Sequence, residues 1–573
     1  MPPAAPQPRR PVERLRYYVA GAFTVEHRPG DGVCADTAVV LLPPMGYEDT
    51  CAHRPLRVLA DALAAEGFVV LQLEWPGLGD SVGDDASPDL GERWFAAIQA
   101  ACGALRARGH TRVAGVGVRV GALLALAAPG FDQLVLWAMP TNGRAFLREE
   151  RVFERMSAPV AGKPYAGPGP EPGTVEAAGF VYRAPTIAAL EALDGTSLAS
   201  ARSGLERVLL IERDDAVPAP ALLDALGTAG ARVTVGPAAG LGDLLERPYK
   251  AALNDAVRGA ILDWFAAGRV PGEHPRIHPG PTAELRLALP NGVTEHPWVA
   301  RGEVGELSGI VCEPAGGARP GAAWTTFYNA GGMRRSGPNR LWTTAARALA
   351  AQGSPSLRFD VRDVGDSDGS DVAHRDLDGM YSEASIGDAL LAWDWVHAQN
   401  AGNVDVVGLC SGAFLGMQVA SRRAVRSALL FNGLAFVWND EARASDMTSE
   451  VGRSLFDGRR WRRLLTGRID AVELARSLAL KGRVRGSATL ARLRGHPPPD
   501  DVAELIRTVT GRGTHLHLVS SDGDPSIAYL QAHTTLKTRP KLTILPGVDH
   551  TIRPIWAHGH VVSLVTGMNP GAR

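Results

Sequence analysis

The stretch Val404-Asp-Val-Val-Gly408-Leu-Cys410-Ser411-Gly412-Ala-Phe-Leu-Gly416 sets the organisation of the chain. A β-branched run ends at Gly408, and an apolar helical pattern begins after Gly412. This order predicts a strand, a tight turn and a helix. Small residues on both sides of Cys410 fit a turn that is too tight for flanking side chains. The alternative interpretation is a buried cysteine in a glycine-rich turn.

The spacing of Gly408, Cys410 and Gly412 is that of the G-x-S-x-G nucleophile elbow, with cysteine where serine usually sits. The N-terminus of the following helix would point at the sulfur and favour the thiolate. Ser411 is a second candidate nucleophile, but the elbow exposes its central position. We therefore expect Cys410 to be the nucleophile.

Composition excludes several classes of protein. The chain has 573 residues, which predicts more than one domain, and its net charge of −1 argues against nucleic acid as a main partner. Its five cysteines are scattered without a CxxC pair, so we expect neither a disulfide framework nor a metal site. No cofactor motif occurs, and no run of about 18 apolar residues predicts a membrane span. We expect a cytoplasmic protein whose first 16 residues, rich in Pro, Ala and Arg, are a disordered tail.

The order of predicted elements repeats along the chain. Short apolar strands alternate with helices from Thr37 onward, and the same order returns from Ala322. The phrase Gly79-Asp80-Ser81 recurs as Gly365-Asp366-Ser367, and Gly117 matches Gly408 at nearly the same offset. Such a repeat predicts two tandem α/β domains, each a mostly parallel sheet flanked by helices. We place these domains at 17–275 and 276–573, with cap insertions at about 141–205 and 434–513.

An acid and a histidine follow the last two predicted strands of the second domain. Asp524 comes after the strand 514–519, and His550 comes after the strand 541–545. Parallel strands end at one edge of a sheet, so both residues are expected beside Cys410. We assign His550 as the base and Asp524 as the orienting acid, with Asp522 as a close competitor. Alternatively, Asp524 only caps a helix and His550 lies solvated in a loop.

Two backbone N–H groups are expected to form an oxyanion hole. One belongs to Ser411, the residue after the nucleophile. The other comes from the loop Asn329-Ala-Gly331-Gly332, where we choose Gly331. The alternative is a plain glycine-rich turn.

The first domain lacks these groups. Its elbow is Gly117-Val-Arg119-Val-Gly121, and arginine cannot act as an acyl-transfer nucleophile because it stays protonated. No histidine occurs in the stretch 236–243, which follows its last predicted strand. We expect an inactive domain in which Arg119 forms an internal salt bridge with Asp214 or Asp215. An anion clamp is the other possible role of Arg119.

The second cap is basic. Residues 440–512 contain fourteen arginines and one lysine against ten acids, an excess of five positive charges. The run Arg459-Arg460-Trp461-Arg462-Arg463 concentrates this charge. It is either a solvated helix face or a landing surface for an anionic acyl carrier, such as acyl-CoA or an acyl carrier protein.

From residue 36 onward the chain resembles the α/β-hydrolase superfamily. More narrowly, it is similar to the exosortase A system-associated hydrolases. The first half resembles the second type of that pair through Gly117 to Ala122. The second half resembles the first type through the motifs Ala330-Gly-Gly332, Arg358-Phe-Asp360, Val364-Gly-Asp-Ser-Asp-Gly369 and Gly408-Leu-Cys410. The resemblance implies the α/β-hydrolase fold and a Cys-His-Asp triad, although both halves in one chain is a departure.

These observations predict an acyl hydrolase or acyltransferase of thioesterase type, which works through an acyl-thioester on Cys410. The alternative is a non-catalytic carrier-binding or scaffold protein in which Cys410 is structural. We expect an acyl substrate, no cofactor and no metal.

Overall fold

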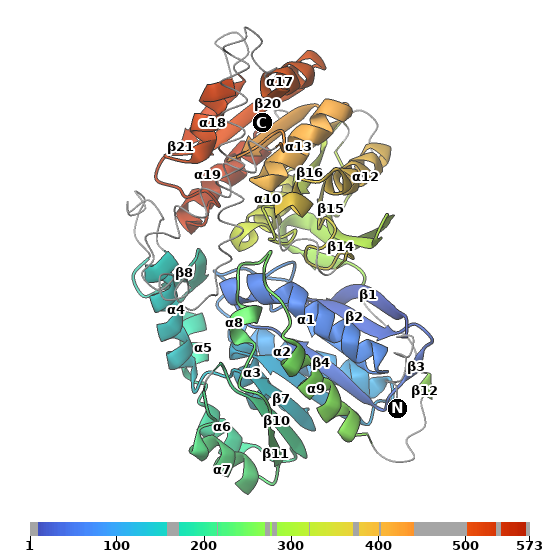
Figure 1. The fold of residues 1–573 in the computed structure, drawn as a ribbon, viewed down its shortest axis with the longest axis vertical. Coiled ribbons are helices and arrows are strands. Elements are labelled where there is room, and N and C mark those ends of the chain that lie inside the picture. Colours follow the sequence, from blue (N-terminus) through green and yellow to red (C-terminus); the bar gives the residue numbers. More distant parts are fainter. Residues whose placement is uncertain are drawn as a thin grey trace, which may run out of the picture.

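The computed structural model describes residues 10–157, 171–214, 216–269, 276–277, 284–319, 321–370, 377–399, 403–439, 501–533 and 540–568. Within these ranges the chain forms two large sheets, one in each half (Figure 1). None of the described helices is both long enough and apolar enough to cross a membrane.

The sheet of the N-terminal half has eight strands. In spatial order they are β1 (Val12–Val19), β2 (Ala22–Pro29), β5 (Val69–Leu73), β4 (Thr37–Leu42), β6 (Arg112–Val118), β7 (Gln133–Trp137), β10 (Arg207–Ile211) and β11 (Arg232–Val235). The first two strands run antiparallel to their neighbours, and the other strands are parallel. The central parallel strands β5, β4, β6 and β7 are buried on both faces, whereas the edge strand β11 is mostly exposed.

The sheet of the C-terminal half has nine strands. Their order is β13 (Leu287–Leu289), β14 (Val293–Gly302), β15 (Gly305–Pro314), β17 (Ser356–Phe359), β16 (Trp324–Tyr328), β18 (Val404–Leu409), β19 (Ser427–Phe431), β20 (His515–Ser521) and β21 (Lys541–Leu545). Apart from the added edge strand β13, this order is the same as that of the first sheet. Both halves are therefore α/β, with a mostly parallel sheet that begins with antiparallel strands.

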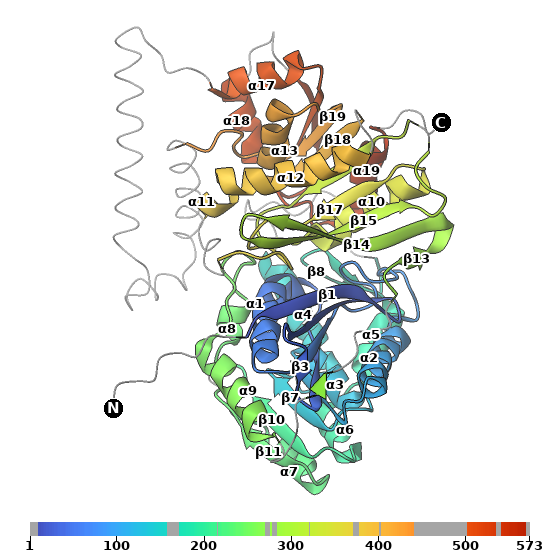
Figure 2. The ribbon, with the colours of Figure 1, turned by 90° about the vertical axis from the view of Figure 1, so that its right-hand side faces the viewer.

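Helices pack on both faces of each sheet (Figures 1 and 2). In the N-terminal half the main covering helices are α1 (Tyr47–Ala65), α2 (Leu90–Ala107), α3 (Val120–Ala127) and α9 (Asp255–Ala267). In the C-terminal half they are α10 (Leu341–Ala351), α12 (Glu383–Gln399), α13 (Ser411–Arg422) and α19 (Ile555–Thr566). Each sheet thus separates two apolar cores, one on each face.

The insertion of the first half lies between β7 and β10. Its described elements are α4 (Gly143–Ser157), β8 (Val175–Ala177), β9 (Phe180–Tyr182), α5 (Ala184–Glu191) and α6 (Gly195–Ala201). Of the second insertion, the structure describes residues 434–439 and α17 (Asp501–Gly511). The arginine-rich run 459–463 lies outside the described residues.

The remaining described helices and strands are short or peripheral. They are β3 (Val33–Cys34), α7 (Pro220–Thr228), α8 (Leu241–Leu244), β12 (Arg276–Ile277), α11 (Leu377–Met380) and α18 (Pro525–His533), with 3-10 turns at Pro290–Gly292 and Pro338–Arg340.

Two expected boundaries differ from the structure. The disordered tail was expected to reach residue 16, but β1 begins at Val12 and pairs with β2 along its whole length, because the hairpin supplies its hydrogen-bond partners. Residues 1–9 lie outside the described residues. The expected domain boundary at 275 also precedes β12, which pairs with β3 of the first half, so the second sheet starts only at Leu287.

Candidate active site

The turn between β18 and α13 holds Cys410 in a strained conformation. Its φ of 58° and ψ of −116° are rare for any residue with a side chain. A Cβ on Gly408 would lie 2.1 Å from the carbonyl oxygen of Gly412, and one on Gly412 would lie 2.5 Å from the carbonyl oxygen of Asn329. Only glycine fits at both places, as the spacing predicted.

Asp524 and His550 meet as expected from their positions after two neighbouring strands. His550 Nδ1 lies 2.7 Å from Oδ2 of Asp524, whose side chain is only 2% exposed. The other carboxylate oxygen of Asp524 accepts the N–H of Ser526 at 2.9 Å. Asp522, the competing acid, is exposed, and its N–H donates to the carbonyl of Leu545.

The charges around His550 favour its protonated form. Burial alone would lower the pKa of His550, but the negative charge of Cys410 and the hydrogen bond with Asp524 outweigh it and raise this pKa to about 10. Burial would raise the pKa of Asp524, yet its bond with His550 holds that pKa below its usual value. His550 Nε2 is buried and has no hydrogen-bond partner of good geometry among the described residues, so it is available to the Cys410 sulfur. His550 therefore lies beside Cys410, with its Nδ1 bonded to the carboxylate of Asp524.

Sequence reasoning missed Asn432, which fixes the backbone of the histidine loop. Its Nδ2 donates to the carbonyl of His550 at 2.6 Å and to Oγ of Ser521 at 2.9 Å. Its Oδ1 accepts the N–H of Ser521 at 2.7 Å. Ser521 Oγ in turn donates to the carbonyl of Asp549. The only sequence signal was an asparagine directly after a buried strand. Asn432 follows β19 and has a φ of 46°, a conformation that asparagine tolerates better than most residues.

Gly331 lies next to the elbow, but its N–H is already engaged. It donates to Oγ of Ser411 at 2.8 Å. Ser411 is the first residue of α13, where backbone N–H groups have no partner within the helix. An oxyanion formed at Cys410 would thus compete with the Ser411 hydroxyl for the N–H of Gly331.

The other four cysteines differ from Cys410 in burial. Cys34, Cys51, Cys102 and Cys312 are buried, whereas Cys410 is partly exposed. Burial raises the pKa of all four thiols, that of Cys102 to about 12. These four remain protonated at neutral pH and are poor nucleophiles.

The N-terminal half has the same elbow with different chemistry. Arg119 has a φ of 54° and a ψ of −124°, close to the values of Cys410. Its guanidinium bonds Glu48 at 2.9 Å and also Glu149. The expected partner Asp214 instead accepts the N–H of Gly242, and the other expected partner, Asp215, lies outside the described residues. Glu48 lies in α1 and Glu149 in α4, so they approach the elbow only through the folding of distant segments.

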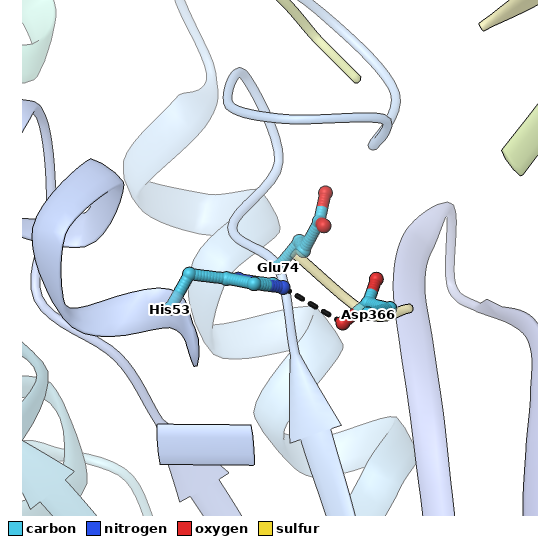
Figure 3. Close-up of side chains that lie close together, drawn as sticks. All are labelled: His53, Glu74 and Asp366. Atoms are coloured by element: carbon cyan, nitrogen blue, oxygen red, sulfur yellow. Dashed lines mark hydrogen bonds and ion pairs between the residues drawn. The ribbon is translucent and has the colours of Figure 1, made fainter. Parts of the chain in front are cut away.

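Three buried side chains between the halves, His53, Glu74 and Asp366, come close enough to suggest a metal site (Figure 3). His53 Nε2 lies 2.8 Å from Asp366 Oδ1, while its Nδ1 lies 3.0 Å from a guanidinium nitrogen of Arg334. Arg334 also donates to Glu74, and Arg335 donates to Asp366 at 2.7 Å. Two guanidinium groups thus supply the positive charge there, which does not fit a metal ion.

No family model and no curated protein matches the chain. Among solved structures, it is similar to an alpha-beta serine hydrolase homologue from Coxiella burnetii, with 15% identity over 48% of this chain and 96% of that one, at a TM-score of 0.29. It is also similar to a dienelactone hydrolase from Anabaena variabilis, with 15% identity over 48% of this chain and 97% of that one, at a TM-score of 0.31. A cold-adapted esterase from an Arctic intertidal metagenomic library shows 14% identity over 48% of this chain and 95% of that one, at a TM-score of 0.30.

The strand order and the elbow of each half define the α/β-hydrolase fold. The two halves share the same strand order, and each has a strained turn between a strand and a helix at the corresponding place. Its second elbow has cysteine at the central position, and its first has arginine.

Proposed function

We propose that the C-terminal half catalyses acyl transfer through Cys410, His550 and Asp524. The observation that carries the proposal is the bond of His550 to a buried carboxylate, together with the effect of the Cys410 charge on its pKa. Cys410 would be the nucleophile, His550 the proton carrier, and Asp524 the group that fixes the imidazole. The N–H groups of Ser411 and Gly331 are the proposed oxyanion donors.

The proposed reaction has two steps. The Cys410 thiolate attacks the carbonyl carbon of an acyl thioester, and the resulting tetrahedral oxyanion collapses to expel the substrate thiolate, which takes the proton of His550. An acceptor then gives its proton to His550 and attacks the Cys410 acyl-thioester, which releases the thiolate of Cys410. Water as acceptor makes the protein a thioesterase, and an amine or alcohol makes it an acyltransferase.

A thioester is the proposed substrate because exchange between a thiolate and a thioester is nearly thermoneutral. An ester or lactone would be hydrolysed by the same steps. An amine or alcohol acceptor would place the protein in a biosynthetic pathway. The N-terminal half would be inactive because Arg119 occupies its elbow.

Iodoacetamide labelling tests the proposal against a non-catalytic scaffold. An activated Cys410 thiolate should be alkylated far faster than the four buried cysteines, as measured by mass spectrometry of the peptides. Labelling of Cys410 no faster than that of a free cysteine in the unfolded chain would support the scaffold instead. Turnover of acyl thioesters, lost in Cys410→Ala, would then establish the chemistry.

We further propose that the basic stretch 440–512 receives an anionic acyl carrier. Its excess of five positive charges would steer such a carrier, and steering weakens with salt. Replacing Arg459, Arg460 and Arg463 with Glu should lower kcat/KM for a carrier-bound thioester and spare a small neutral one. Equal losses on both substrates would contradict carrier docking.

A further inference from the structure

The loop from Asn329 to Arg340, which follows β16, carries the proposed oxyanion donor and three arginines. At one end, Gly331 is bonded to Ser411 of the elbow. Toward the other end lie Arg334, Arg335 and Arg340, all of them buried. Buried guanidinium groups require partners, so their bonds decide where the loop can lie.

Arg334 is held entirely by the N-terminal half. Its guanidinium donates to Asp49 at 2.6 Å and also to Glu74, and it lies 3.0 Å from Nδ1 of His53. Asp49 and His53 belong to α1, and Glu74 follows β5 directly. The side chains of Asp49 and Glu74 are 8% and 4% exposed, so water screens these bonds little.

Arg335 and Arg340 join the halves as well. Arg335 donates to Asp80 of the first half at 2.8 Å and to Asp360 and Asp366 of its own half at 2.6 and 2.7 Å. Arg340 donates to four backbone carbonyls of the first half, those of Gly77, Gly79, Ser81 and Gly83. The repeated Gly-Asp-Ser phrases therefore meet around Arg335.

The N-terminal half also supports the loop through its backbone. A Cβ added to Gly332 would lie 2.7 Å from the N atom of Tyr249 and 3.0 Å from the carbonyl carbon of Pro248. The chain of the first half thus lies directly against the residue that follows Gly331. The loop cannot shift toward the first half without a clash, and it cannot shift away without breaking the bonds of Arg334.

We propose that the N-terminal half positions the oxyanion loop of the C-terminal half, with Asp49 and Glu74 as positioning residues that act through Arg334. The inference rests on the proposed acyl transfer. A half whose own elbow holds arginine would then serve as a built-in activator of the other half. Without the two carboxylates, Arg334 would lose its charged partners and the loop would no longer present Gly331 at the elbow.

The test separates oxyanion stabilisation from thiolate reactivity. Acyl transfer from a thioester forms an oxyanion, whereas alkylation by iodoacetamide displaces iodide at a methylene carbon and forms none. In the full chain, the double variant Asp49→Asn/Glu74→Gln should lower kcat for a small acyl thioester by about tenfold or more, since loss of an oxyanion donor is costly. Its rate of Cys410 alkylation should stay within about twofold of the unmodified protein.

Two further variants keep the test decisive. Glu306→Gln is the matched control, because Glu306 accepts a bond from Arg16 of the first half at 3.0 Å and so also joins the two halves. Neither Glu306 nor Arg16 belongs to the loop, so this variant should leave both rates nearly unchanged. Gly332→Ala should reproduce the selective loss by steric pressure alone, without a change of charge.

A selective loss of kcat in the double variant and in Gly332→Ala, but not in Glu306→Gln, supports the proposal. Unchanged kcat in the double variant overturns it. Parallel loss of kcat and alkylation in both variants also overturns it, because the interface would then hold the whole second half together. If Cys410→Ala kept full turnover, the proposed chemistry itself would be wrong, whatever the interface variants did.

Discussion

Replacing Asp524 with Asn should shift the loss of activity at alkaline pH, the alkaline limb of the pH profile, toward neutral pH. His550 has its pKa raised to about 10, and its bond to Asp524 contributes to that rise. The active form of a thiolate–imidazolium pair requires protonated His550, so activity should fall only as pH rises through about 10. In Asp524→Asn this limb should appear at lower pH because the neutral amide stabilises the imidazolium less.

The size of the shift follows from the contact. The bond spans 2.7 Å and its carboxylate is 2% exposed, so it is a charge-assisted hydrogen bond with little screening. Such bonds contribute roughly 1.5–3 kcal/mol, and one pKa unit corresponds to about 1.4 kcal/mol. The alkaline limb should therefore lie about one to two pH units lower in Asp524→Asn than in the unmodified protein. Loss of the correct imidazole orientation should also lower kcat, by about a hundredfold or more.

The assay is kcat/KM for an acyl thioester between about pH 6 and 11, with thermal unfolding as a check on the fold. Asp522→Asn is the matched control, because that exposed carboxylate lies two residues away. Its profile should match that of the unmodified protein. An unchanged alkaline limb in Asp524→Asn, or a shift in Asp522→Asn instead, would refute the assignment of Asp524.

Four other substitutions test the remaining assignments. Cys410→Ala should abolish turnover with the fold intact, while Ser411→Ala keeps turnover within about tenfold; the reverse pattern in steady-state kinetics would make Ser411 the nucleophile. Arg119→Met should lower the free energy of unfolding by about 2 kcal/mol in a denaturant titration, since it leaves the half-buried carboxylate of Glu48 without its charged partner; a change below about 0.5 kcal/mol would count against a structural role. Asn432→Ala should cost about 2 kcal/mol and lower kcat because the carbonyl of His550 loses its donor; an unchanged kcat would show that the histidine loop holds its place without this bond.

Much of the fold could be predicted from local patterns. Short apolar runs between glycine and proline turns predicted the last two strands: β21 has the expected bounds of 541–545, and β20 (His515–Ser521) lies close to the expected 514–519. Helix α1 begins at Tyr47 and continues through Pro55. Proline is a weak signal here, because contacts in the folded protein can offset the hydrogen bond it removes. The hairpin of β1 and β2 was missed for a related reason, since its strand begins in a stretch with a polar composition.

By itself, the sequence determined the local geometry of the site. Glycine at 408 and 412 permits a tight turn that a side chain at either place would block, and the order of strands places Cys410, Asp524 and His550 at one edge. These are consequences of sterics and of the period of apolar residues, which act over a few positions. Only the tertiary structure decided what surrounds them. Asn432 reaches His550 across 118 positions, and Arg334 meets Asp49 across 285, in the partner half of the chain. Such pairs depend on which buried charges and carbonyls happen to face each other after folding, and no local pattern encodes that choice.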